Sequence, residues 1–226
     1  MLNAFHISDL HLTSAQTGQL RDATAASVRC ILELAKALKA NGTLGSHTCL
    51  IMTGDIVQSG ELHATNEISD FHLLHEKLMI PLLEIMGIGP DRVFMVPGNH
   101  ELDRGAVPTD QRVEQNYNSS GRVCQADIER DLVSKLGLYF DFVERHGYNS
   151  VSISSPRIAS FDVDQQNIVC LNGLAGAYSR PGSGDKGELF TLHSEIANDF
   201  SIVTKNSVVL THHPLSWYTD SCGTDL

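Results

Sequence analysis

The chain has 226 residues, of which 42% are hydrophobic and 19% are charged, so one folded domain with a sizeable core is expected and a disordered chain is not. It carries 27 acidic and 16 basic side chains and a formal charge of −11. Because non-specific nucleic-acid binding depends on neutralising phosphates, this balance disfavours a nucleic-acid partner, although a local basic groove would remain compatible with it.

The N-terminus has no basic stretch followed by an apolar one, and no uncharged apolar run approaches the roughly 18 residues that span a membrane. The five cysteines form no C-x-x-C pair, which is typical of reduced structural thiols in the cytosol. These features predict a soluble, cytoplasmic protein with no membrane partner.

The first hundred residues alternate short apolar runs with helical patterns, which is the mark of a layered α/β fold. The helical pattern that starts near residue 62 contains Pro81, where we expect a bend or a break. His72 and His75 lie in that pattern, and we interpret them as ordinary helix positions rather than as metal ligands. The expected strands are 2–7, 49–52 and 92–96, and the expected helices are 19–40, with Asn41-Gly42 as its stop, and 62–86.

The second half of the chain is less regular. Residues 103–148 are expected to be a helical insertion outside the central sheet. Further expected elements are helices near 124–136 and 137–146, strands 150–161 and 167–171, a Gly/Ser-rich loop 173–187, a short helix 188–199 and a strand 207–211.

Four of the expected strands run directly into polar clusters. Ligand sites of α/β sheets assemble where the carboxyl ends of strands meet, so clusters from separate strands can share one site. Carboxylates together with imidazoles suit first-row divalent metals such as Mn, Fe and Zn, whereas a calcium site would contain only oxygen. The clusters are Asp9-Leu10-His11, Gly54-Asp55, Gly98-Asn99-His100-Glu101 and His212-His213-Pro214.

In this order the clusters resemble the D-x-H, G-D, G-N-H-D/E and histidine blocks of the calcineurin-like metallophosphoesterase family. The resemblance implies a four-layer α/β/β/α sandwich and a single domain over residues 1–226. It also implies two divalent ions (Mn, Fe or Zn) and hydrolysis of phosphoric esters by a hydroxide that bridges them. By the same resemblance, Asp9 and His11 would hold the first metal, Asp55 would bridge both, and Asn99 and His212 would hold the second.

The resemblance also suggests roles beside the metals. His100 would protonate the leaving oxygen or stabilise charge there, and Glu101 would orient His100. Arg104 has two interpretations, a phosphate contact or a structural ion pair. His213 also has two, lining the pocket or hydrogen-bonding to backbone.

One block of the family is absent, because a final G-H-x-H should follow His212 and no Gly-His dipeptide occurs in the chain. We therefore expect a domain incomplete at its C-terminus, with the block supplied by a longer chain or a second subunit. The alternatives are a catalytically weakened, metal-binding regulatory domain and a nuclease domain of a larger protein. The resemblance implies a phosphodiester or a phosphomonoester as the substrate.

Overall fold

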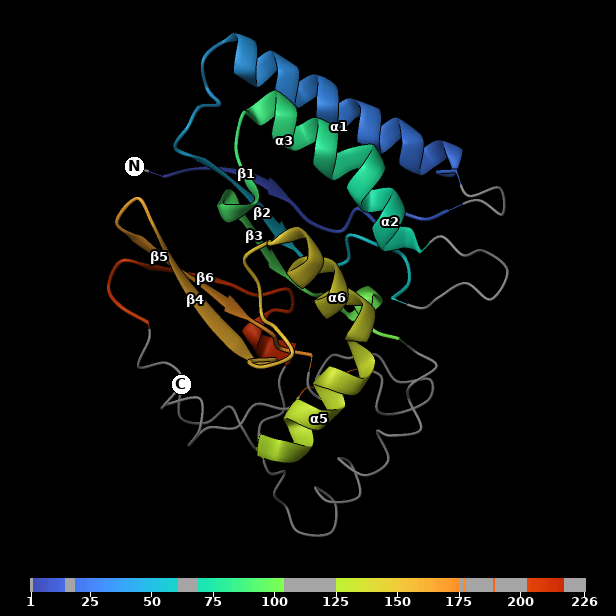
Figure 1. Ribbon diagram of the computed structural model, residues 1–226, viewed down its shortest axis with the longest axis vertical. Coiled ribbons are helices and arrows are strands. Elements are labelled where there is room, and N and C mark those ends of the chain that lie inside the picture. The colour runs from blue at the N-terminus through green and yellow to red at the C-terminus, as the bar shows by residue number, and fades with distance from the viewer. Residues whose placement is uncertain are drawn as a thin grey trace.

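Two three-stranded sheets lie next to each other at the centre of the protein in the computed structural model (Figure 1). The structure describes residues 2–14, 19–60, 69–103, 125–174, 177, 189 and 203–217. Among these residues the architecture is α/β with two sheets, as the sequence predicts. The first sheet has the order β1 (Asn3–Ile7), β2 (Thr48–Thr53), β3 (Val93–Val96), and the second has the order β4 (Ile158–Val163), β5 (Gln166–Leu171), β6 (Ser207–Leu210).

The first sheet is fully parallel, which places the carboxyl ends of all three strands at one edge. β3 is buried along its whole length, and β2 along all but its last residue, Thr53. Strands buried on both faces read as continuous apolar runs, and this is why the sequence identified them without any alternation.

Helices cover one face of the first sheet (Figure 1). α1 (Asp22–Ala40) ends at Asn41-Gly42, where Gly42 has a left-handed φ of 78°. α1 packs against α3 (Ile80–Met86), and the helices, the first sheet and the second sheet form three successive layers.

The expected irregularity near Pro81 is present as a wide turn. α2 (Asp70–Leu74) continues into a π-helix, η1 (His75–Met79), which passes directly into α3. Proline has no N–H and its ring crowds the carbonyl four residues earlier, so a wider turn before Pro81 relieves both problems.

The second sheet is held to the first at its hairpin. β4 and β5 are joined through Asp164 and Gln165, whose φ angles of 48° and 67° are both left-handed, as a tight two-residue hairpin turn requires. The Arg92 guanidinium donates two hydrogen bonds, of 2.8 and 3.0 Å, to the Asp164 carboxylate. Arg92 ends the short 3-10 helix η2 (Pro90–Arg92) that leads into β3, so the hairpin is tied to the start of that strand.

Two predictions for the second half of the chain have clear outcomes. The predicted helices near 124–136 and 137–146 are present as α5 (Gln125–Lys135) and α6 (Gly137–His146). The predicted strand 150–161 was wrong at its start, because β4 begins only at Ile158. The backbones of Ser152 and Ser155 bond to each other in a tight turn, and Pro156 has no N–H to offer a ladder.

Other predictions lie mostly outside the described residues, namely the helix 188–199, of which only Leu189 is described, and the loop 173–187. None of the helices in the described segments is both long and apolar enough to cross a bilayer.

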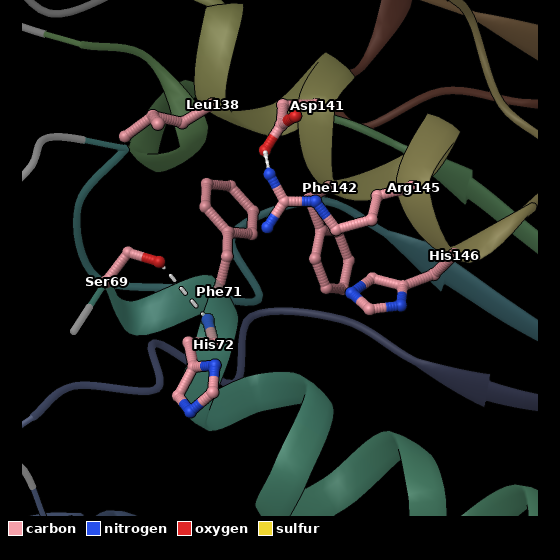
Figure 2. Close-up of a pocket in the computed structure, with 8 residues that line it drawn as sticks. All are labelled: Ser69, Phe71, His72, Leu138, Asp141, Phe142, Arg145 and His146. Carbon is pink, nitrogen blue, oxygen red and sulfur yellow. Dashed lines mark hydrogen bonds and ion pairs between the residues drawn. The ribbon is translucent and has the colours of Figure 1, made fainter.

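α2 and α6 enclose a small hollow (Figure 2). Beside it the rings of His75 and His146 stack, with centroids 3.6 Å apart and planes 18° from parallel. Nδ1 of His75 also lies 3.2 Å from the Tyr148 hydroxyl. Burial lowers the pKa of both histidines, and each is further lowered by a neighbouring imidazole. These histidines therefore pack and hydrogen-bond as structural residues of the helices.

The stacked pair predicts a pH-dependent loss of stability. Because the pKa of both rings is below its ordinary value in the folded state, the unfolded chain binds more protons as the pH falls through about 6.5. The contribution of these two rings to the free energy of unfolding should therefore fall between about pH 7 and pH 5.5. Urea unfolding of the metal-free protein measures this, and the matched variant His146→Phe, which keeps a ring and loses one titrating group, should show a shallower fall. Parallel curves for the two proteins would contradict the assignment.

Candidate metal centre

Three residues at the strand ends adopt a left-handed backbone. Asp9, His11 and Asp55 have φ values of 55°, 48° and 51°, and among non-glycine residues only a few per cent do so. Aspartate and histidine tolerate this region better than most side chains, and such strain gathers at functional sites. All three are residues that the sequence predicts as metal ligands.

Hydrogen bonds between the loops hold this strained backbone. Beyond the ends of β1 and β2, the N–H of Asp9 donates to the Gly54 carbonyl (3.1 Å) and the N–H of His11 to the Asp55 carbonyl (2.9 Å). Leu12 continues this pairing to Ile56 at 2.8 Å. The two loops therefore extend the parallel ladder, and the relative positions of their side chains are fixed by backbone.

Two glycines let the loops approach closely. A Cβ on Gly54, whose φ is 80°, would lie 2.6 Å from the Gly98 nitrogen and 2.7 Å from Cγ of His212. A Cβ on Gly98 would collide with the Asp55 backbone and carboxylate. Only glycine allows the chain to pass here, so these two positions bring the ends of β2 and β3 and the segment after β6 together.

Three imidazoles converge on one carboxylate oxygen. Oδ2 of Asp55 lies 3.9 Å from Nε2 of His11, 4.0 Å from Nε2 of His100 and 3.5 Å from Nε2 of His212. Metal–nitrogen and metal–oxygen bonds of about 2.0–2.2 Å place two donors of one ion about 3–4 Å apart. The separations from His11 and His100 are too long for hydrogen bonds, and all three match donors arranged around cations.

Within the described residues the ligand-type atoms form two groups that share Asp55. One is His11, Asp55 and His100, and the other is Asp9, Asp55 and His212. Asn99 lies in the same loop, as the first residue of the 3-10 helix η3 (Asn99–Glu101). The structure therefore brings Asp9, His11, Asp55 and His212 together, while Arg104 lies outside the described residues.

The orientation of the His212 ring suits a metal ligand. Its Nδ1 lies 2.8 Å from the Thr53 carbonyl and donates to it, which leaves Nε2 facing Asp55. Burial would lower the pKa of His212, but Asp55 and the Thr53 carbonyl raise it to about 9. Burial opposes ionisation of Asp55, yet His212 and the N–H of His100 hold the pKa of this carboxyl below its ordinary value.

Glu101 is buried behind the site and accepts hydrogen bonds from backbone. Its two oxygens receive four N–H groups at 2.6–3.0 Å. Burial raises the pKa of Glu101 to about 7, and the hydrogen bonds oppose that rise. The sequence predicts that Glu101 orients His100, whereas these contacts indicate that it fixes the loops. The four donors are Gly98, Asp55, Ile56 and Val57.

Gln58 is the partner of His100 that the sequence did not reveal. Nδ1 of His100 lies 3.0 Å from the Gln58 carbonyl and 3.2 Å from its side-chain amide nitrogen. A hydrogen bond to the carbonyl places the proton on Nδ1 and leaves Nε2 turned towards Asp55. Gln58 lies only three residues after Asp55, but nothing in the sequence pattern shows that its carbonyl faces an imidazole.

A sequence model of calcineurin-like phosphoesterases matches residues 2–226. The chain belongs to the calcineurin-like phosphoesterase family. This family hydrolyses phosphoesters with divalent metals, and the His/Asp groups at the strand ends are the candidate metal ligands in this member. No curated protein was found to match the chain.

The hydrogen bonds of Glu101 predict a large effect of a small substitution. Glu101→Gln would present an amide NH₂ to backbone donors and leave at least one of them unsatisfied in the interior. The free energy of unfolding should fall by about 1–3 kcal/mol in urea titrations. The matched control is Glu33→Gln, since Glu33 forms an exposed pair with Lys36 and its loss should cost less than about 0.5 kcal/mol. Equal stability of both variants would rule out the proposed fixing of the loops.

Proposed function

We propose that this protein hydrolyses phosphoric esters at a site for two divalent cations, with Asp55 as the ligand shared by both. Asp9 and His11 belong to the first cation, and Asn99 and His212 to the second. The observation that supports this most directly is the position of Asp55 Oδ2, within 4.0 Å of three imidazole nitrogens and common to both ligand-type groups.

The donor set fits such cations chemically. Two carboxylates and two imidazoles suit Mn, Fe or Zn, and the shared carboxylate supplies the negative charge that two adjacent cations require. When bound, divalent ions lower the pKa of a water molecule and stabilise negative charge on phosphoryl oxygens. The chain itself contributes fixed positions, because its ligands stand on loops that share backbone hydrogen bonds.

His100 is proposed to act on the leaving oxygen. Its ring contacts His11 edge to face at 4.5 Å, and its Nε2 is 4.0 Å from Asp55 Oδ2, at the edge of the ligand set. With the Nδ1 proton directed at the Gln58 carbonyl, Nε2 can hold a second proton and donate it to the departing oxygen. Gln58 therefore serves as the positioning residue for His100.

Small phosphodiesters or phosphomonoesters are the proposed substrates. The chain has a formal charge of −11, and this disfavours a polyanionic partner. Binding of DNA with a steep salt dependence would instead favour a nuclease. Metal binding without turnover of an aryl phosphodiester would favour a regulatory, metal-binding domain.

Substitution of the shared ligand tests the proposal. Asp55→Asn keeps the shape of the side chain but removes its charge, so both metal content and hydrolysis should be lost. The expected fall in kcat/KM for an aryl phosphodiester with Mn²⁺ is about 10³-fold or more. Asp141→Asn is the matched control, because Asp141 forms an exposed ion pair with Arg145 and belongs to neither ligand-type group. Unchanged metal content and turnover in Asp55→Asn would contradict the shared role.

His100 is tested by separating metal content from rate. His100→Gln should lower kcat by about 10²–10⁴-fold while the bound metal, measured by elemental analysis, stays at the wild-type level. His72→Gln changes an exposed histidine on α2 and serves as the control. If metal content falls together with kcat, His100 is a ligand of the first cation rather than the acid.

A further inference from the structure

His213 is buried beside the ligand set but makes no polar contact. Its side chain is 2% exposed, and neither ring nitrogen has a hydrogen-bond partner among the described residues. The backbone hydrogen bond considered from the sequence is therefore wrong for this ring. The ring is therefore held by packing rather than by hydrogen bonds. It packs as an apolar ring would.

The His213 ring contacts aromatic rings on two sides. The His213 ring meets His212 at a centroid distance of 4.6 Å and an angle of 72°, which is an edge-to-face contact. It meets Trp217 at 5.0 Å and 31°. Trp217, His213 and His212 thus form a continuous row of rings that ends on a proposed metal ligand.

A local turn places Trp217 in this row. Pro214 follows the two histidines, and the 3-10 helix η6 (Leu215–Trp217) begins directly after it. The N–H of Trp217 donates to the Pro214 carbonyl at 2.9 Å, which folds the indole back towards His213. The segment H-H-P-L-S-W therefore contains both the ligand and the rings behind it.

Packing supplements the polar contacts of His212, which are the Nδ1 hydrogen bond to Thr53 and the approach of Nε2 to Asp55. The hydrogen bond from Nδ1 to the Thr53 carbonyl holds one corner of the ring, and the bare Cα of Gly54 lies close to its Cγ. A glycine offers no side chain to stop the ring from tilting about that hydrogen bond. The edge-to-face contact with the His213 ring opposes this tilt.

We propose that His213 is a positioning residue whose ring, backed by Trp217, fixes the orientation of His212 so that Nε2 faces Asp55. The expected effect on metal binding rests on the proposed function, in which His212 is a metal ligand. The geometric part concerns the metal-free protein, in which packing of the ring holds the Nδ1 hydrogen bond to Thr53.

The test compares removal of the ring with its replacement. In metal-free protein labelled with ¹⁵N-histidine, the Nδ1–H signal of His212 should be sharp in the wild type and broadened in His213→Ala. It should recover in His213→Phe, which has a ring but no ring nitrogens. In calorimetric titrations with Mn²⁺, His213→Ala should bind about 10–100-fold more weakly, as for loss of a residue supporting a ligand. His213→Phe should recover most of that affinity, and Trp217→Ala should weaken it by less than His213→Ala.

The outcomes separate the two proposals. If His213→Phe loses as much Mn²⁺ affinity as His213→Ala, a ring nitrogen matters and the packing role is wrong. A sharp His212 signal in His213→Ala also overturns it, and if that variant does not fold, a broadened signal in Trp217→Ala supports the role and a sharp one overturns it. If the NMR pattern is as expected but neither wild type nor any variant binds Mn²⁺, the positioning role stands and the proposed function fails. His212→Ala, which should lose one Mn²⁺, is the reference for complete loss of this ligand.

Discussion

Four backbone N–H groups converge on the buried carboxylate of Glu101, and the arrangement of the candidate metal centre depends on them. The donors come from the ends of two different strands, β2 and β3, so a single side chain joins both ligand-bearing loops. A buried carboxylate is stable only if its oxygens are satisfied, and buried N–H groups need acceptors equally. The carboxylate and the four N–H groups therefore hold each other in place, and Asp55, which supplies one of these N–H groups, has little freedom to move.

This fixed framework explains how the protein tolerates strain at its ligands. Left-handed φ angles at Asp9, His11 and Asp55 cost of order 1–3 kcal/mol each, and they persist only where the surroundings determine them. The surroundings here are the ladder bonds between the loops and the close passage of Gly54 over Gly98. In return, carboxylate and imidazole donors face one another at distances that suit cations. A reaction that needs metal ligands in fixed positions benefits, because the cost of the strained backbone is met during folding.

β3 connects the site to the rest of the fold. At its start, Arg92 holds the hairpin of the second sheet through Asp164, and its end leads directly into Asn99 and His100. The second sheet in turn carries β6, whose end delivers His212 across to the first sheet. Association of the two sheets is therefore what brings the last candidate ligand, His212, to the others. A change at the hairpin, far from the ligands in sequence, acts on the same assembly.

The sequence by itself determined the strands of the first sheet, the order of the polar clusters and the types of the candidate ligands. Buried parallel strands are apolar throughout and end in polar residues, and both features are local and visible in one dimension. It also placed α5 and α6 correctly, but it extended β4 back to residue 150, because alternation alone does not show a serine turn before a proline.

Tertiary structure alone decided which side chain serves which neighbour. Glu101 follows His100 directly in the sequence, but its carboxylate accepts hydrogen bonds from backbone N–H groups. Nδ1 of His100 meets the carbonyl of Gln58, and His213 packs without polar contacts. A sequence carries residue identity and spacing, and these fix chemical type. The direction of a hydrogen bond and the face of a ring depend instead on backbone angles and on segments more than a hundred residues apart, such as Thr53 and His212, which meet only after the two sheets have packed.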